Sequence, residues 1–365
     1  MTRWVVLILM FACAIAAAQA QSLDPTVVPP RITGWLHTSG TQILEESNKP
    51  VRLCGIGGSM GTAMKAQASN ISDWGFNAVR IPIMWGSLEP TAPTKNADGT
   101  LTHHWDAGYL SKLDSVMAEY GKRGIGVVLV MSHGRWFVGK GDDTFPAWLY
   151  KSGPGGNRFR NEFFANIGGA QVKPLDGFAE AWKCIAERYA DNPTLAGIDI
   201  LDKPGYQQGD NLDALYAKVA EGIRSVNRRV LIIFEDVRTN RNPTVLQDPP
   251  TVTNAVYSVH LYADDWTHDG KTWMDMVRKR AEEWKVPIYV GEFNAFDGGL
   301  NVQNPKTRPA DWRAQTKAFL DYCREHGISW SFAQYEGPAP AFSSIVVPDT
   351  GKPKEDLVKL LQSGF

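Results

Sequence analysis

Short apolar runs alternate with longer amphipathic segments along this chain from residue 51 onward. The runs are rich in Val, Ile, Leu and aromatic residues, and polar, Gly or Pro residues follow each one, which is typical of buried parallel strands. The predicted strands are VRLCGIG (51–57), NAVRIPI (77–83), GVVLVMSH (126–133), LAGIDIL (195–201), RVLIIFE (229–235), AVYSVHLY (255–262), PIYVGEF (287–293) and ISWSFAQ (328–334).

The segments between these runs have apolar residues at the three-to-four spacing of helices. Residues 109–124 and 177–192 show this spacing, with a Gly or Asn near the predicted stop. Repeated βα units without a linker, an internal repeat or a low-complexity tract predict an α/β chain folded as one (β/α)8 TIM barrel. Its active site is expected where the strands end, on the C-terminal side of the barrel.

The first 20 residues have the pattern of a secretory signal. They contain an early positive charge at Arg3, an apolar stretch and a small-residue ending, so residues 1–20 are predicted to be removed and residues 21–365 to form the barrel domain. The alternative is an uncleaved anchor helix, although the apolar run is short for a membrane span. A secreted or periplasmic protein, with no membrane attachment after cleavage, is expected.

Two segments outside the predicted strands, residues 22–49 and 137–174, are expected to cover the two ends of the barrel. Residues 22–49 are expected to cap the barrel floor or to form a small hairpin. Residues 137–174 contain many Gly and polar residues and are expected to form a long loop over the cleft after the third strand.

Composition and charge narrow the class of partner. The chain is 43% hydrophobic and 21% charged, which suits a globular domain, and its formal net charge is -1. This balance gives no basic surface for nucleic acid or anionic lipid, and it fits a neutral partner such as a carbohydrate. Beyond the signal, Cys54, Cys184 and Cys323 remain, an odd set that is interpreted as small core residues rather than a disulfide framework.

Polar residues stand at most of the predicted strand ends, where a barrel would gather them. No His or Cys spacing typical of a metal site occurs, and no metal or cofactor is predicted. The strand-end residues are Arg80, His133, Asp202, Lys203, Glu235, His260, Tyr262, Glu292, Trp330 and Gln334.

Several short motifs on successive strands resemble glycoside hydrolase family 5, the cellulase-like barrels of clan A. They are NAVRIPIMW on the second strand, SHG on the third, VHLY on the sixth and VGEF on the seventh. The resemblance implies a retaining glycosidase acting on a β-linked polysaccharide or oligosaccharide. It also implies a carbohydrate substrate; the sugar, the linkage and the oligomeric state are left open.

The resemblance implies that Glu292 is the nucleophile, with Arg80 and Tyr262 hydrogen-bonding it. A carboxylate suits this role because the transition state is oxocarbenium-like and the glycosyl-enzyme bond forms to it. The alternatives for Glu292 are a solvated glutamate at a loop edge and a structural ion pair with Arg80. His133 and His260 would border the sugar, with the core histidine as alternative. Trp330 would stack on the sugar, as Trp85, Trp136 and Trp266 also could, and the alternative for any of these tryptophans is core or surface packing.

One strand end departs from this pattern. Members of the family usually carry Asn-Glu-Pro after the fourth strand, with the glutamate as acid/base, and this chain has Asp202, Lys203 and Pro204. Lysine stays protonated at neutral pH, so it cannot accept the proton of the attacking water. Ala333 stands where the family usually has a tryptophan under the sugar.

Three replacements for the missing acid/base are considered: Glu235, Asp202 and an acidic or good leaving group on the substrate itself. Glu235 has the alternative of a rim glutamate paired with Arg238. Two other functions remain open. One is a catalytically impaired barrel that binds carbohydrate without efficient turnover, and the other is Schiff-base chemistry at Lys203.

Overall fold

The computed structural model describes residues 28–132, 144–149, 157–167, 172–204, 211–237, 245–262, 270–295, 311–337, 344–348 and 350–365. The predicted signal and His133 lie outside the described residues, as do residues 137–143, 150–156 and 168–171 of the segment expected to form a loop after the third strand. Within them, no helix is both long enough and apolar enough to cross a membrane.

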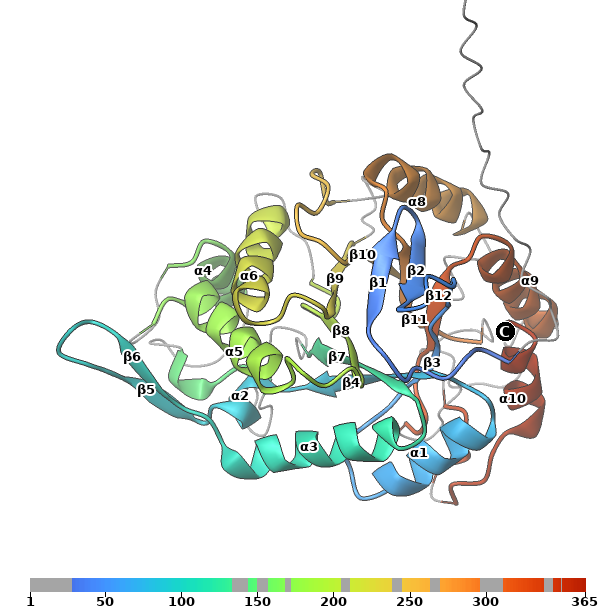
Figure 1. Ribbon diagram of the computed structural model, residues 1–365, viewed down its shortest axis with the longest axis horizontal. Coiled ribbons are helices and arrows are strands. Elements are labelled where there is room, and N and C mark those ends of the chain that lie inside the picture. The colour runs from blue at the N-terminus through green and yellow to red at the C-terminus, as the bar shows by residue number, and fades with distance from the viewer. Residues whose placement is uncertain are drawn as a thin grey trace, which may run out of the picture.

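The centre of the molecule is a closed barrel of parallel strands, surrounded by helices (Figure 1). Its strands follow one another around the barrel in chain order, so the predicted single-domain (β/α)8 fold is confirmed. Every predicted run contributes a strand. They are β3 (Cys54–Gly57), β4 (Ala78–Ile83), β7 (Gly126–Met131), β8 (Leu195–Asp199), β9 (Leu231–Glu235), β10 (Ala255–Leu261), β11 (Ile288–Phe293) and β12 (Ser329–Phe332).

The helices lie outside the strands and bury their apolar faces against them. Local sequence sets their starts: Asp106 caps α3 by accepting a hydrogen bond from the Tyr109 N–H at 2.6 Å, and Asn211 caps α6 in the same way. The helices are α1 (Met64–Asp73), α2 (Trp85–Leu88), α3 (Ala107–Gly121), α4 (Asn157–Phe164), α5 (Pro174–Arg188), α6 (Leu212–Val226), α8 (Lys271–Trp284), α9 (Trp312–Glu325) and α10 (Glu355–Gln362), with a 3₁₀ turn η2 (Ala147–Leu149).

A small antiparallel hairpin, β1 (Leu36–Ser39) with β2 (Gln42–Glu45), closes the barrel floor, as expected for this segment. Its Leu36 and Ile43 side chains belong to one buried cluster with barrel residues such as Val128 and Ile233. The barrel is therefore filled from below by apolar side chains, and the polar groups are left to the opposite, C-terminal ends of the strands.

A second hairpin, β5 (Thr91–Lys95) with β6 (Leu101–His104), projects from the side of the barrel beside α5 (Figure 1). It lies between β4 and α3 in the chain. The hairpin is an insertion into the second βα unit and ends directly before α3.

We predict that Gly57→Ala strongly destabilises the fold. A Cβ at Gly57, where β3 meets β12, would overlap the backbone carbonyl oxygen of Ala333, which cannot move without breaking the sheet. Overpacking of this kind costs about 1–3 kcal/mol or more. Urea unfolding followed by circular dichroism measures the loss.

The matched control is Gly222→Ala in α6. The Cβ there would meet Ala179 O at an ordinary 3.6 Å, and alanine favours a helix interior over glycine by about 0.5–1 kcal/mol. Equal stability of the Gly57 and Gly222 variants would contradict the account of the β3–β12 contact.

Candidate active site

The strand ends converge on the guanidinium of Arg80, a buried residue within β4. Its Nη2 lies 2.9 Å from Asp199 Oδ2, 2.8 Å from Asp202 Oδ1 and 3.4 Å from Glu235 Oε2, and its Nη1 lies 3.8 Å from Glu292 Oε2. One cation therefore faces carboxylates from β8, from the turn after it, from β9 and from β11. The barrel brings together charges that are up to 212 residues apart in the chain.

Glu292 is held by three groups in the barrel mouth. Its Oε1 accepts hydrogen bonds from Tyr262 Oη at 2.6 Å and from Lys203 Nζ at 3.0 Å, and Arg80 lies near its Oε2. Burial raises the pKa of Glu292, but the charges of Lys203 and its other cationic neighbours outweigh burial and lower it below its usual range. Glu292 is therefore an ionised carboxylate at neutral pH.

Lys203 reaches Glu292 from a strained backbone. Its φ of 46° lies in the left-handed region that a non-glycine residue seldom adopts, and Pro204 follows directly. The backbone is held there because the Lys203 N–H donates to Glu235 Oε1 at 2.8 Å. Burial lowers the pKa of the ammonium, but Glu292 and Asp202 raise it more, so Lys203 stays charged.

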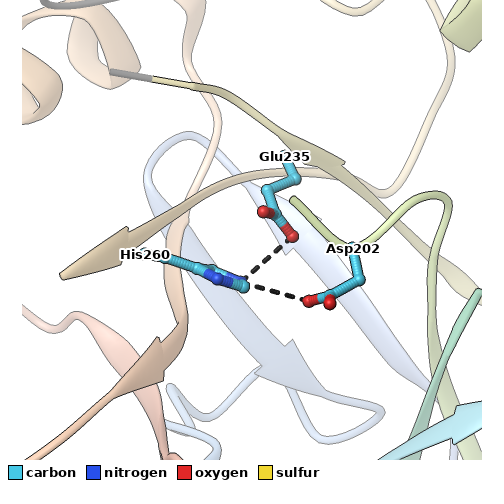
Figure 2. Close-up of side chains that lie close together, drawn as sticks. All are labelled: Asp202, Glu235 and His260. Carbon is cyan, nitrogen blue, oxygen red and sulfur yellow. Dashed lines mark ion pairs between the residues drawn. The ribbon is translucent and has the colours of Figure 1, made fainter. Parts of the chain in front are cut away.

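Glu235 and His260 form the deep part of the site, next to Asp202 (Figure 2). His260 Nε2 lies 3.0 Å from Glu235 Oε2 and 4.0 Å from Asp202 Oδ1, so the ring points between the two carboxylates. Burial raises the pKa of Glu235 well above its usual range, and burial with Arg80 lowers the pKa of His260 to about 4. Burial therefore favours the neutral form of both side chains.

Asp202, Glu235 and His260 offer ligand atoms within 4.8 Å of one another, as the ligands of a metal site would. However, Arg80 Nη2 already lies 2.8 Å from Asp202 and 3.4 Å from Glu235. A metal ion would have to occupy the space beside a guanidinium, with strong like-charge repulsion. The arrangement fits a carboxylate cluster neutralised by arginine better than it fits a metal site.

The structure brings together most of the strand-end residues predicted from the sequence. Strand register pairs His260 directly with Glu292 on the neighbouring strand, and Gly291 leaves room for the imidazole, since a Cβ there would lie 2.9 Å from its Nε2. His133 lies outside the described residues, so its role stays a prediction. The residues brought together are Arg80, Asp202, Lys203, Glu235, His260, Tyr262 and Glu292.

The prediction that Trp330 stacks on the sugar is wrong. Its side chain is fully buried on the helix-facing side of β12, with its ring 5.6 Å from Phe293 and 6.2 Å from Phe76. The same holds for Trp85, which packs in the core against Phe178. Both tryptophans stabilise the contact between strands and helices.

Glu235 is not a glutamate at the rim of the barrel. It is 1% exposed and contacts Arg80 and His260. Arg238, its suggested partner, lies outside the described residues. Asp199 was not among the predicted site residues; it is fully buried and accepts a hydrogen bond from Arg80 Nε at 2.9 Å. An acidic residue inside the apolar run LAGIDIL was the available signal, since a buried carboxylate requires a partner.

We predict that Asp199 makes stability fall as pH rises from about 4 to about 7. Burial, opposed by Arg80, raises the pKa of Asp199 to about 7, against about 3.9 in an unfolded chain. In that window the folded protein holds a proton that the unfolded chain has lost, so raising the pH favours unfolding. Asp199→Asn removes this contribution.

Urea unfolding across this pH range measures the slope in both proteins. The control is Asp191→Asn, whose side chain is 97% exposed, and it should keep the slope of the parent protein. An unchanged slope in Asp199→Asn would contradict a buried protonated carboxyl at this position.

Comparisons with known proteins agree with this architecture. An endoglucanase of Paenibacillus polymyxa is 22% identical over 329 residues, covering 74% of this chain and 73% of that protein. Endo-glycoceramidase II from Rhodococcus sp., as a lactosyl-enzyme intermediate, superimposes with a TM-score of 0.67 at 22% identity, over 90% of this chain and 80% of that one.

The catalytic domain of the major endoglucanase from Xanthomonas campestris pv. campestris gives a TM-score of 0.63 at 18% identity, over 90% of this chain and 99% of that one. At these identities the structural likeness supports the fold. The model of the family Cellulase (glycosyl hydrolase family 5) matches residues 44–337, which is most of the chain and includes every barrel strand. The chain therefore belongs to the cellulase family, glycosyl hydrolase family 5.

Proposed function

We propose that this protein is an exported glycosidase acting on a β-linked glycan, with Glu292 as the nucleophile of a retaining mechanism and an impaired acid/base position at Lys203. The observation that carries the proposal is Glu292, ionised at the end of β11 and held by Tyr262 at 2.6 Å. Membership in a glycosidase family, and the likeness to endoglucanases and an endo-glycoceramidase, support the substrate class. The signal-like residues 1–20 support export.

In the first step, the Glu292 carboxylate attacks the anomeric carbon and the aglycone leaves. The leaving oxygen needs a proton, and Lys203 holds its proton tightly because its pKa is raised. In the second step a base must activate water, and an ammonium cannot accept that proton. Both steps are therefore slow, and substrates whose leaving group needs no protonation are favoured.

Neither neighbouring carboxyl group replaces the missing glutamate well. Burial favours the protonated form of Glu235, which an acid requires, but Glu235 is 1% exposed and accepts the Lys203 N–H. Asp202 is more accessible, but Arg80 holds it and its pKa is lowered despite burial, so it carries no proton to donate. Asp202 is suited to accept a hydrogen bond from a sugar hydroxyl.

A second candidate function is carbohydrate binding without efficient turnover. The specific observation in its favour is the 3.0 Å contact between Lys203 Nζ and Glu292 Oε1. This ion pair withdraws electron density from the carboxylate and so reduces the nucleophilicity of Glu292, although it contacts Oε1 and not Oε2. The two candidates differ in whether Glu292 still forms a glycosyl-enzyme bond.

We predict that an activated 2-fluoro β-glycoside labels Glu292 covalently. Such a probe carries a good leaving group, so the first step does not depend on an acid at position 203, and the fluorine slows the second step. Intact-protein and peptide mass spectrometry measure the adduct. Glu292→Gln is the control, and the absence of label across gluco, galacto and manno probes would favour the binding-only function.

We predict that Lys203→Glu combined with Asp202→Asn raises turnover of an unactivated β-glycoside. The change supplies the missing acid/base, a group typically worth about 10²–10⁴-fold in rate. Steady-state kinetics on soluble β-linked oligosaccharides measure the gain.

Lys203→Gln is the matched control for this double variant. It removes the ion pair with Glu292 without adding an acid/base, so it separates release of the nucleophile from proton transfer. A gain in Lys203→Gln equal to that of the double variant would show that the ion pair, and not the missing acid, limits the enzyme. No gain in either variant would contradict the role proposed for position 203.

A further inference from the structure

A cavity of about 370 Å³ opens on the outer side of the barrel, between the end of the β5–β6 hairpin, α3 and α5. Its volume lies within the range of small-ligand pockets, about 300–1,000 Å³. It shares no lining residue with the strand-end cluster around Arg80. The lining includes His103, Trp105, Glu180, Lys183, Glu187 and Arg188.

We propose that this cavity is a second carbohydrate-binding site, which holds a short segment of a neutral glycan outside the barrel mouth. The first observation is a flat aromatic platform. The rings of His103 and Trp105 stack with centroids 4.5 Å apart and an angle of 3° between their planes, and both line the cavity. Because His103 covers one face of the partly exposed Trp105 ring, the pair offers a sugar only its outer face, and a flat aromatic face suits the apolar face of a sugar ring.

The second observation is that a buried acid fixes this platform. Glu89 is fully buried, and its Oε1 lies 2.7 Å from His103 Nδ1 while its Oε2 accepts from Trp85 Nε1 at 3.2 Å. Burying a carboxylate to orient a histidine on a projecting hairpin is costly, and it locks the ring before any ligand arrives. Such preorganisation reduces the entropy lost on binding.

The third observation is the balance of charge around the platform. Glu180 and Glu187 supply acceptors, and Lys183 and Arg188 supply donors, so the formal charges of these four side chains cancel. Arg188 is fixed by Asp114, whose Oδ1 accepts from its Nε at 2.8 Å. With Asp114 counted, these side chains carry a slight excess of negative charge, which gives no attraction to a nucleotide or another polyanion. Side-chain donors and acceptors together suit the hydroxyl groups of a neutral sugar.

The test measures glycan binding in Glu292→Gln, which removes the proposed nucleophile and so prevents turnover. Swollen cellulose and cellohexaose serve as probes, and this choice rests on the proposed function. Trp105→Ala should weaken retention on swollen cellulose about fivefold, as expected for loss of one aromatic contact. Trp35→Ala is the matched control, because Trp35 is also partly exposed but does not line the cavity. Its ring is covered by Arg229, whose Cζ lies 4.2 Å from the ring centroid.

A second measurement does not depend on the alanine variant folding. In ¹⁵N-labelled Glu292→Gln, the indole N–H signal of Trp105, assigned with Trp105→Phe, should shift on addition of cellohexaose. Unchanged retention in folded Trp105→Ala, an indole signal that does not move, or no binding of either probe would overturn the proposal. Failure of the catalytic proposal is read separately, from the absence of label on Glu292.

Discussion

The barrel mouth depends on one buried cation, Arg80. Its guanidinium lies within 3.4 Å of Asp199, Asp202 and Glu235 and within 3.8 Å of Glu292. Without it, these carboxylates would face one another in a setting that excludes water, where like charges repel strongly. A single arginine cannot neutralise all of them, so protons make up part of the difference, as the raised pKa values of Asp199 and Glu235 show.

Lys203 contributes to the same balance between carboxylates and cations in the barrel mouth. In a mouth with an excess of acid, a second cation lowers the electrostatic cost of keeping Glu292 ionised, and it does so by direct contact at 3.0 Å. The lysine therefore stabilises the negative charge of Glu292 and, by the same contact at Oε1, makes the carboxylate a weaker nucleophile. A glutamate at this position would instead add negative charge and be driven to hold a proton, which is the state an acid/base requires before the first step.

The sequence was sufficient for the barrel and for most of its mouth, because strand ends in a parallel barrel meet on one side and every predicted strand was found. It was not sufficient for the direction of side chains. In β12, Ser331 faces the barrel interior, where it contacts Tyr289, so the neighbouring Trp330 faces the helices. The alternation of serine and aromatic residues in SWSF contained this information. The strained backbone of Lys203 could not be foreseen, because it results from a hydrogen bond to Glu235, a residue 32 positions away.

The proposed acid/base defect makes the chemistry slow, and a second binding site then matters more than it would in a fast enzyme. When the chemical steps are slower than dissociation, most encounters with a glycan end without reaction, and yield depends on how long the polymer stays near the mouth. The proposed glycan contact at Trp105 is supported by Glu89 through His103. It raises the local concentration of the bound glycan near the barrel mouth and does not depend on the acid/base residue. It also lies outside the Arg80 cluster, so it can strengthen glycan retention without disturbing the charge balance on which Glu292 depends.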